Sequence, residues 1–81
     1  MWFVYIIQSS KNNKLYTGIT TDLVRRLQEH NSGKKGAKYT KTGRPWLLVY
    51  SEEYPNRSSA SIREAEIKKM SRENKLKLIG V

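Results

Sequence analysis

The chain has 81 residues, enough for one domain with a thin core, because a domain of this size removes only about 60–65% of its unfolded-chain surface from water. It contains no cysteine, which excludes disulfides, a thiol nucleophile and a thiolate metal site, and favours a reducing compartment. Sixteen lysines and arginines against seven acids give a net charge of +9. The positive electrostatic field of this charge attracts polyanions. Nucleic acid is the favoured partner, although anionic membranes and acidic proteins would respond to the same field.

The first predicted element is a strand over residues 2–8. Its two faces, one beginning at Trp2 and the other at Phe3, are both apolar, as in a strand covered on both sides. The apolar run is too short for a membrane span and lacks the basic flank of a signal peptide. We therefore expect a cytoplasmic protein with no membrane partner.

A turn at residues 12–13 leads to a second strand at residues 15–19, and the two strands are expected to form an antiparallel hairpin. Side chains alternate with period two, so any even-length loop leaves Tyr5 and Tyr16 on one sheet face, whereas an odd loop would separate them. Gly18 would leave space beside both rings. A turn centred on residues 12–13 pairs Ile7 with Gly18, Ser9 with Tyr16 and Tyr5 with Thr20.

The third element is a helix that begins at Thr21, whose hydroxyl would cap it, with Asp22 in the first turn. It ends within residues 31–33. Arg26 and His30 lie one turn apart on a stripe that also holds two leucines. The two polar side chains are therefore expected at the edge of a packed helix face.

No acid occurs between Glu29 and Glu52, a segment rich in lysine and glycine. Glycines let backbone amides approach a phosphate, and Tyr39 and Trp46 could stack on an unpaired base. The alternative is a solvated loop whose lysines serve solubility. Together with Arg25 on the preceding helix, the predicted nucleic-acid contacts of this segment are Lys34, Lys35, Lys38, Lys41 and Arg44.

The remaining elements are a third strand at residues 46–51, again apolar on both faces, and two helices. The first helix follows a turn at residues 55–56 and carries an apolar stripe, and Ser71 is expected to cap the second. The order strand, strand, helix, strand, helix, helix (ββαβαα) predicts one α+β domain over residues 1–81. Its core would be a three-stranded antiparallel sheet flanked by helices.

Glu64 lies in the first of these two helices and admits two structural interpretations. Ser61 and Glu64 have the spacing of a capping box, in which the glutamate closes a helix N-terminus. A helix that begins near Ser58 instead places Glu64 inside the helix, at the border of its core stripe. Glu66 borders the other side of that stripe and is the second candidate for a metal ligand.

The order of these elements and residues resembles the GIY-YIG nuclease domain superfamily, in particular its small stand-alone bacterial members. The resemblance covers residues 1–79 and depends on the order and spacing of short motifs, none of which is specific alone. The motifs are Phe3-Val4-Tyr5, Tyr16-Thr17-Gly18, Arg26 in the helix after them, and Glu64 in Ile62-Arg-Glu-Ala-Glu.

The resemblance implies a metal-dependent endonuclease that acts on DNA and responds to backbone or structure more than to base sequence. Tyr5 and Tyr16 would orient or deprotonate the attacking water. Arg26 would bind the scissile phosphate, and Glu64 would hold a single Mg²⁺ or Mn²⁺. His30 stands where some restriction enzymes with this fold have a histidine that takes part in catalysis. A guanidinium and a hard cation also suit phosphodiester cleavage on chemical grounds.

Two residues depart from the family's motifs. Phe3 replaces the first-motif glycine, and Ile19 replaces a lysine often found three residues after the second tyrosine. Asn74 is a candidate for a late polar partner of the metal. Because the ordinary pKa of tyrosine is near 10, the general base stays open among a tyrosine with a lowered pKa, His30 and metal-bound water.

Two other classes of function fit the same sequence. One is a non-catalytic basic module that binds nucleic acid through the loop at residues 34–44. The other is an interaction module of a repair or recombination complex, which would recruit a protein partner through exposed apolar residues of the last helix.

Overall fold

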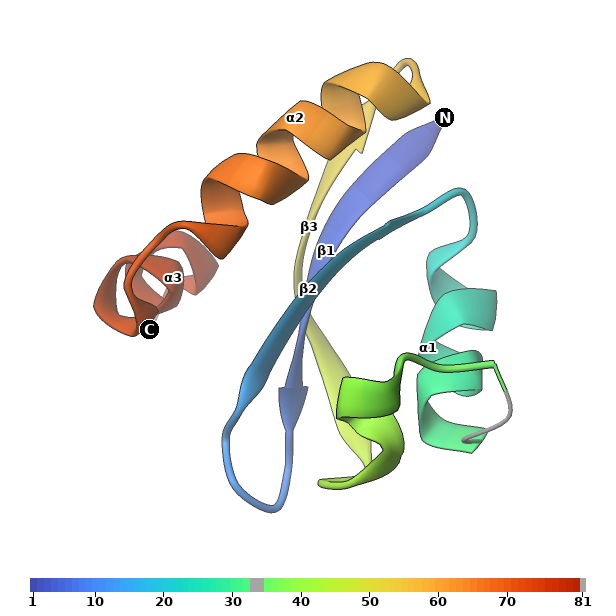
Figure 1. Ribbon diagram of the computed structural model, residues 1–81, viewed down its shortest axis with the longest axis vertical. Helices are drawn as coiled ribbons and strands as arrows, with labels where there is room; N and C mark the ends of the chain where they lie inside the picture. The colour runs from blue at the N-terminus through green and yellow to red at the C-terminus, as the bar shows by residue number, and fades with distance from the viewer. Residues whose placement is uncertain (33–34, 81) are drawn as a thin grey trace.

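A computed structural model describes residues 1–32 and 35–80 of the chain (Figure 1). It contains the elements that the sequence predicts, in the predicted order, so the α+β fold with a three-stranded antiparallel sheet is confirmed. None of the helices in these residues has the length and hydrophobicity needed to cross a membrane. The elements are β1 (Trp2–Ser9), β2 (Leu15–Thr20), α1 (Leu23–Ser32), the 3₁₀ turn η1 (Lys38–Lys41), β3 (Trp46–Tyr54), α2 (Arg57–Lys68) and α3 (Arg72–Ile79).

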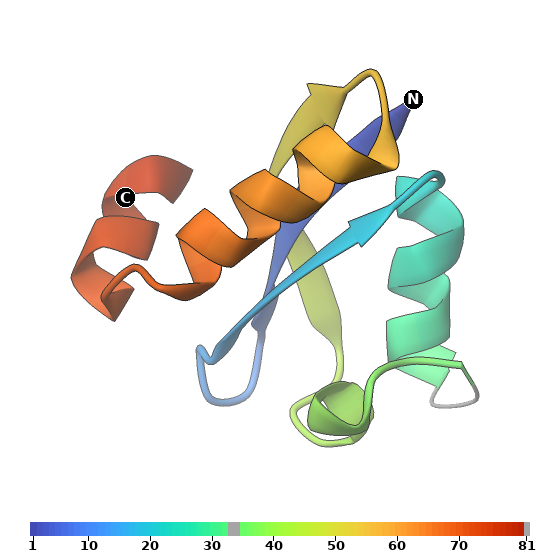
Figure 2. The ribbon, with the colours of Figure 1, turned by 45° about the horizontal axis from the view of Figure 1, so that its top comes forward.

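The sheet has the strand order β2-β1-β3, with β1 in the centre and antiparallel to both neighbours. Figures 1 and 2 show α1 on one side of the sheet and α2 with α3 on the other. Both faces of β1 are therefore covered, as the sequence predicts. Val4 and Ile6 pack with Ala60 and Ile67 of α2, whereas Tyr5 and the neighbouring apolar residues of the opposite face pack toward α1.

The predicted register of the hairpin is wrong by two residues. Tyr5 faces Gly18 instead of Thr20, and Ile7 faces Tyr16 instead of Gly18. The cause is the side chain of Ser9, which accepts hydrogen bonds from the amides of residues 11 and 12 at 3.1 and 3.2 Å and so moves the turn toward the N-terminus. Ser9 consequently no longer pairs with Tyr16. A shift of two residues keeps every side chain on its predicted face.

The starts of two helices also differ from expectation. Asp22, not Thr21, caps α1, because its carboxylate accepts from the amide of Arg25 at 3.1 Å. Asn56 caps α2 by accepting from the amide of Ser59 at 2.8 Å. The capping-box interpretation of Glu64 is therefore wrong, and this residue lies well inside α2.

The edge strand β3 is longer and more exposed than expected. It extends to Tyr54, and Leu47 and Leu48 are 55% and 41% exposed, so the prediction of two covered faces fails at the start of this strand. In α3, by contrast, Leu78 and Ile79 pack against the cluster around Val4. The last helix thus lacks the exposed apolar residues that would recruit a partner.

A polar cluster centred on Glu52 joins β3 to α2. Arg63 donates to both carboxylate oxygens of Glu52, at 2.9 and 3.1 Å, and the hydroxyls of Tyr50 and Tyr54 donate to the same carboxylate. Burial opposes the charge of Glu52, but these hydrogen bonds outweigh it and lower its pKa to about 2. The carboxylate is therefore a fixed anion that anchors α2.

We expect Arg63→Met to lower the free energy of unfolding by about 2 kcal/mol, because it leaves Glu52 half-buried without its cation. The control is Lys77→Met, since Lys77 pairs with Glu73 at 3.7 Å and both side chains are more than two-thirds exposed. That substitution should cost less than about 0.5 kcal/mol. Urea unfolding of the two variants measures the difference, and equal losses would contradict an anchoring role for Glu52.

Candidate active site

Three side chains from three elements meet on the α1 face of the sheet. The ring centroids of Tyr5 on β1 and Tyr16 on β2 lie 6.5 Å apart. His30 of α1 lies 5.9 Å from the first ring and 5.1 Å from the second. The two tyrosines therefore share one face, as predicted, and the histidine completes a compact group.

Gly18 makes room for this group. It lies directly across from Tyr5 in the sheet. A Cβ atom at Gly18 would come within 2.5 Å of the Tyr5 hydroxyl oxygen and 2.7 Å of Cζ, distances that no real contact shows. The glycine of the second motif is thus required because the first tyrosine crosses over it.

Gly18→Ala should displace the Tyr5 hydroxyl and destabilise the fold by about 1–3 kcal/mol, as overpacking does. Thermal or urea unfolding measures the loss. In a Tyr5→Leu background the same substitution should cost much less, because the shorter side chain no longer reaches Gly18. Equal costs in the two backgrounds would show that the clash with Tyr5 is not the reason for the glycine.

His30 is fully buried and uses both ring nitrogens. Its Nδ1 lies 2.8 Å from Thr40 Oγ1, and its Nε2 lies 2.7 Å from the Tyr5 hydroxyl. Thr40 donates its single proton to the carbonyl of Ala37 at 2.8 Å, so it must accept from Nδ1–H of the histidine. In the neutral ring Nε2 is then an acceptor, and Tyr5 donates to it.

The electrostatics of the group favour this neutral state. Burial, and secondarily the charge of Arg26, lower the pKa of His30 to about 4. Burial also raises the pKa of Tyr5 to about 12, although Arg26 opposes the shift. At neutral pH both side chains are uncharged, and the proton between them resides on Tyr5.

Arg26 lies on α1 one turn before His30, with its guanidinium half-buried beside the tyrosine. It interacts with the hydroxyl of Tyr5, and its Nη1 donates to Glu29 at 2.9 Å and to the carbonyl of Lys35 at 2.6 Å. Burial opposes its charge, but the hydrogen bonds with Glu29 and Tyr5 prevail and raise its pKa. The structure therefore brings four of the five predicted catalytic side chains together.

Glu64, the fifth, comes from α2 on the opposite side of the sheet. Its carboxylate pairs with Lys68 at 3.2 Å and is half-buried. Its charge contributes to raising the pKa of Tyr5, so it acts electrostatically on the site, but within the described residues no hydrogen bond or ion pair joins it to the α1-side group.

The donor set at Glu64 limits the kind of metal that it could hold. No group of three or more possible ligands occurs among the residues that the structure describes. Glu66 is mostly exposed, and its carboxylate accepts from Arg63 Nη1 at 3.2 Å in an ion pair, whereas Asn74 is exposed on α3. A single carboxylate fits Mg²⁺ or Mn²⁺, which commonly takes one or two protein carboxylates and completes its shell with water and phosphate oxygens.

The basic segment after α1 divides into exposed and structural residues. Lys35, Lys38 and Lys41 are exposed, whereas Lys34 lies outside the described residues. Arg44 is half-buried, and its Nε donates to the carbonyls of His30 and Thr40 at 3.2 and 3.3 Å. Arg44 thus ties the end of α1 to η1, in addition to its charge.

The two aromatic residues of this segment also differ. Trp46 is buried, and its Nε1 donates to the carbonyls of Thr40 and Thr42 at 3.2 and 3.1 Å, so the expectation that it stacks on a base is wrong. Tyr39 is about half exposed and stacks on Tyr16 with ring centroids 5.8 Å apart. Tyr39 therefore covers one side of the tyrosine–histidine group.

Two residues that support the site were not predicted from the sequence. Thr40 fixes the tautomer of His30, and Asn31 pairs with the backbone of Trp46 through two hydrogen bonds of 2.7 and 3.1 Å. Together they hold the end of α1 against η1 and β3. Neither has a sequence signal, because a polar residue in a loop or at a helix end looks the same whether or not it has a buried partner.

Comparison with known proteins identifies the class of domain. The family model of the GIY-YIG catalytic domain matches residues 1–77, and the chain belongs to this family, which is typically one of nucleases. The resemblance seen in the sequence is thereby confirmed.

The relatives are small bacterial proteins of the UPF0213 group. A UPF0213 protein of Syntrophus aciditrophicus is 56% identical over 77 residues, which cover 95% of this chain and 87% of that protein. UPF0213 protein SH2523 of Staphylococcus haemolyticus is 54% identical, with 95% and 92% covered. The solution NMR structure of UPF0213 protein BH0048 from Bacillus halodurans matches with a TM-score of 0.59 and 42% identity, over 98% of this chain and 83% of that one.

Proposed function

We propose that this protein is an endonuclease that hydrolyses DNA phosphodiester bonds with one Mg²⁺ or Mn²⁺ held by Glu64. The observation that carries the proposal is the buried hydrogen-bonded chain from Tyr5 through His30 to Thr40, beside the guanidinium of Arg26. A tyrosine packed only for stability does not require a neutral histidine of fixed tautomer as its acceptor. A proton relay does.

Tyr5 activates water without first becoming a phenolate. With a pKa of about 12, the phenolate is scarcely populated at neutral pH. The hydroxyl oxygen instead accepts a proton from the attacking water while its own proton moves to Nε2 of His30. Tyr16, whose ring lies against His30, orients that water.

Substrate binding makes this transfer easier. The charge of Arg26 is one cause of the low pKa of His30. A phosphate bound to Arg26 offsets that charge, so the pKa of His30 rises when substrate is present. The histidine therefore becomes a better proton acceptor at the stage when one is needed.

Arg26 binds the scissile phosphate through its remaining guanidinium N–H groups and stabilises charge that develops on the phosphoryl oxygens. A divalent cation, when bound at Glu64, would supply further neutralisation of that charge. In this proposal the relay removes a proton from water, and the cationic groups neutralise the charge on the phosphoryl oxygens.

The substrate that fits best is DNA recognised by its backbone. The net charge of +9 and the exposed lysines of the segment after α1 suit phosphate contacts, which carry little base-sequence information. We therefore infer cleavage selective for structure, by residues 1–81 acting as one domain. We also propose a repair or recombination protein as partner, bound at a surface other than α3, because α3 has no exposed apolar residue. We propose the cytoplasm as the place of action.

A cleavage assay tests the proposal. Wild-type protein with Mn²⁺ should cut at least one of branched, flapped and single-stranded DNA, and EDTA should abolish the reaction. Glu64→Ala should lower the rate by at least about 100-fold, as loss of a metal ligand does. The matched control is Glu66→Ala, which removes an exposed carboxylate of the same helix and should leave the rate nearly unchanged. No cleavage by wild type, or full cleavage by Glu64→Ala, would contradict the proposal.

A second candidate function is non-catalytic binding of nucleic acid. It is favoured by the position of Glu64 on the far side of the sheet, without a second metal ligand among the described residues. This function predicts salt-sensitive binding without turnover, indifferent to EDTA and to Glu64→Ala. The same assay, run beside a binding measurement, separates the two candidates.

A further inference from the structure

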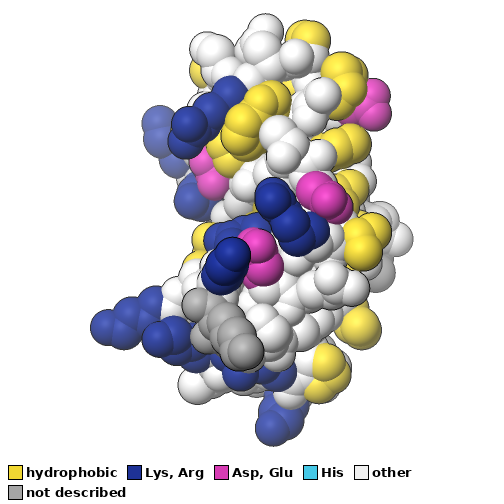
Figure 3. Space-filling view, turned by 90° about the vertical axis from the view of Figure 1, so that its right-hand side faces the viewer, with side chains coloured by type: hydrophobic (Ala, Val, Ile, Leu, Met, Phe, Trp, Pro, Cys, Tyr) yellow, Lys and Arg dark blue, Asp and Glu magenta, His cyan; other side chains and the backbone are white. Residues whose placement is uncertain are grey.

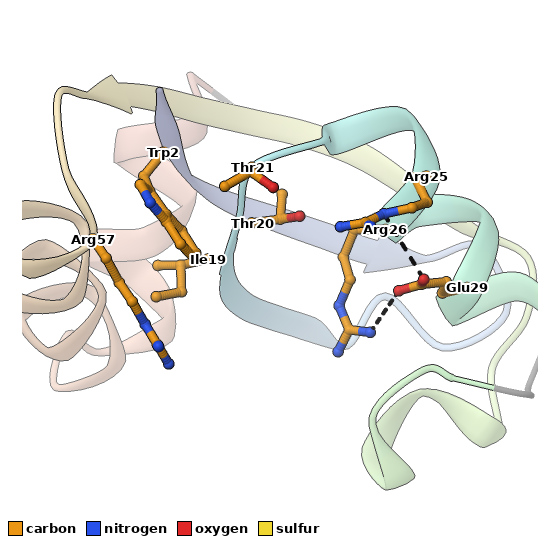
Figure 4. A pocket seen from close by; sticks show the side chains of 8 residues that line it. All are labelled: Trp2, Ile19, Thr20, Thr21, Arg25, Arg26, Glu29 and Arg57. Atoms are coloured by element: carbon orange, nitrogen blue, oxygen red, sulfur yellow. Dashed lines mark hydrogen bonds and ion pairs between the residues drawn. The ribbon is translucent and has the colours of Figure 1, made fainter.

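A cleft of about 300 Å³ lies directly beside the candidate active site. One wall is α1, with Arg25, Arg26 and Glu29, and the other is Arg57, the first residue of α2. The end of β2 also lines the cleft, and the ring of Trp2 lies beside Arg57. Figure 4 shows the side chains of Arg26 and Arg57 extending in the same direction from the two walls, with the end of β2 between them.

Arg57 has features that packing does not explain. It is exposed, and within the described part of the chain no carboxylate pairs with it. It also opens a helix that has no acid in its first turn, at the end where a cation is electrostatically disfavoured. The ring of Trp2 lies 5.5 Å from its guanidinium carbon and holds it over the cleft. Its charge is thus positioned and uncompensated.

The opposite wall holds its arginines with a single carboxylate. Oε1 of Glu29 accepts from Nη1 of Arg26 at 2.9 Å, and Oε2 of Glu29 lies 3.9 Å from Nε of Arg25. The two arginines thus share one carboxylate, and phosphate oxygens are acceptors of the same kind. Three arginines against one glutamate leave the cleft positive.

The surrounding surface continues this charge. In Figure 3, which faces the side of α1, lysine and arginine side chains gather along one margin and at the lower end of the molecule, whereas hydrophobic side chains lie along the other margin.

We propose that this cleft binds a backbone phosphate of the DNA strand being cut, next to the phosphate held by Arg26. Arg57 and Arg25 are its ligands, and Trp2 is the positioning residue for Arg57. The proposal rests on the proposed function, because it takes Arg26 as the ligand of the scissile phosphate. The cleft then fixes the path of the strand and the position of the cut.

The test is DNA binding on a Glu64→Ala background, which separates binding from cleavage. Fluorescence anisotropy with the labelled DNA of the cleavage assay gives the affinity over a series of salt concentrations. Arg57→Gln and Arg25→Gln should each weaken binding several-fold and reduce the slope of log K against log[salt] by about 0.7–0.9, the effect of one lost phosphate contact. Arg72→Gln is the control, an exposed arginine of α3 that donates to the carbonyl of Asn13 and should leave the slope unchanged. A slope for Arg57→Gln equal to that of Arg72→Gln would overturn the proposal.

Glu29→Gln is expected to change the DNA affinity in the opposite direction. The amide keeps an oxygen acceptor for Arg26 but removes the negative charge from the cleft. Binding should become several-fold tighter. Unchanged or weaker binding would show that phosphate does not compete with Glu29, and would overturn the proposal.

Two comparisons identify the source of the phosphate and keep the two proposals distinct. Oligonucleotides with and without a 5′-phosphate should respond equally to Arg57→Gln, and a response confined to the phosphorylated one would replace a backbone phosphate by a terminal one and overturn the proposal. Cleavage by wild type with an unchanged slope for Arg57→Gln refutes the cleft alone. A reduced slope for Arg57→Gln without cleavage by wild type supports phosphate binding in the cleft and refutes the nuclease.

Discussion

Tyr5→Phe should lower the single-turnover rate of DNA cleavage by about 10²–10⁴-fold, the usual contribution of a proton-transfer group. The substitution keeps the ring over Gly18 and removes only the hydroxyl that joins water to Nε2 of His30. Stability should fall by about 1 kcal/mol, because the buried nitrogen loses its hydrogen-bond donor. The rate, measured at saturating protein with Mn²⁺, is the decisive quantity, since single-turnover conditions exclude product release.

Tyr39→Phe is the matched control for this loss. Tyr39 stacks on Tyr16, and within the described residues its hydroxyl has no hydrogen-bond partner. Its removal should change the rate by less than about threefold, in keeping with a group outside the chemistry. If Tyr5→Phe is folded and cuts DNA as fast as Tyr39→Phe does, the proton relay has no part in the reaction.

The second large effect is a loss of stability in mild acid caused by His30. Its pKa is about 4 in the folded protein and close to 6.5 when unfolded. Between these two pH values the unfolded chain binds a proton on His30 and the folded protein does not. The free energy of unfolding therefore falls as the pH is lowered from 6.5 to 4. The loss should amount to roughly 2–3 kcal/mol.

Because His30 is the only histidine, its titration can be followed directly by NMR. We expect a pKa near 4 in the free protein and a higher one in the presence of DNA. Glu52, whose folded pKa is about 2, adds a separate loss only below about pH 4.5, so urea unfolding at pH 7, 5 and 3 distinguishes the two groups. A His30 pKa of 6.5 in the folded protein would mean that the ring is not sequestered with Tyr5.

The parts of this structure that followed from the sequence are those set by periodicity. The two apolar faces of β1, the stripe on α2 and the placement of Tyr5 with Tyr16 all result from side-chain alternation, which a register error of two residues leaves intact. Arg26 and His30 followed in the same way from the spacing of α1. The family motifs then identified which of these residues are candidates for catalysis.

The features that could not be predicted from the sequence depend on single polar contacts, several of them between residues far apart in the chain. The Ser9 hydroxyl moved the hairpin turn, and Asn56 rather than a serine set the start of α2. Thr40 reaches His30 only because η1 folds back on α1, and Arg57 lies beside Trp2 only because α2 starts near the first strand. Composition and spacing carry no trace of such partners.

The proposed function requires Tyr5 and Glu64 to act on one scissile phosphate although they lie on different layers of the fold. A double-mutant cycle measures this directly, with single-turnover cleavage rates for Tyr5→Phe, Glu64→Gln and the protein that carries both. When two groups act as a unit in one step, removing the second costs little once the first is gone. The double variant should therefore be about as slow as the slower single variant. If the two rate losses instead multiply in full, the carboxylate and the tyrosine act independently, and the active site described for this protein is wrong.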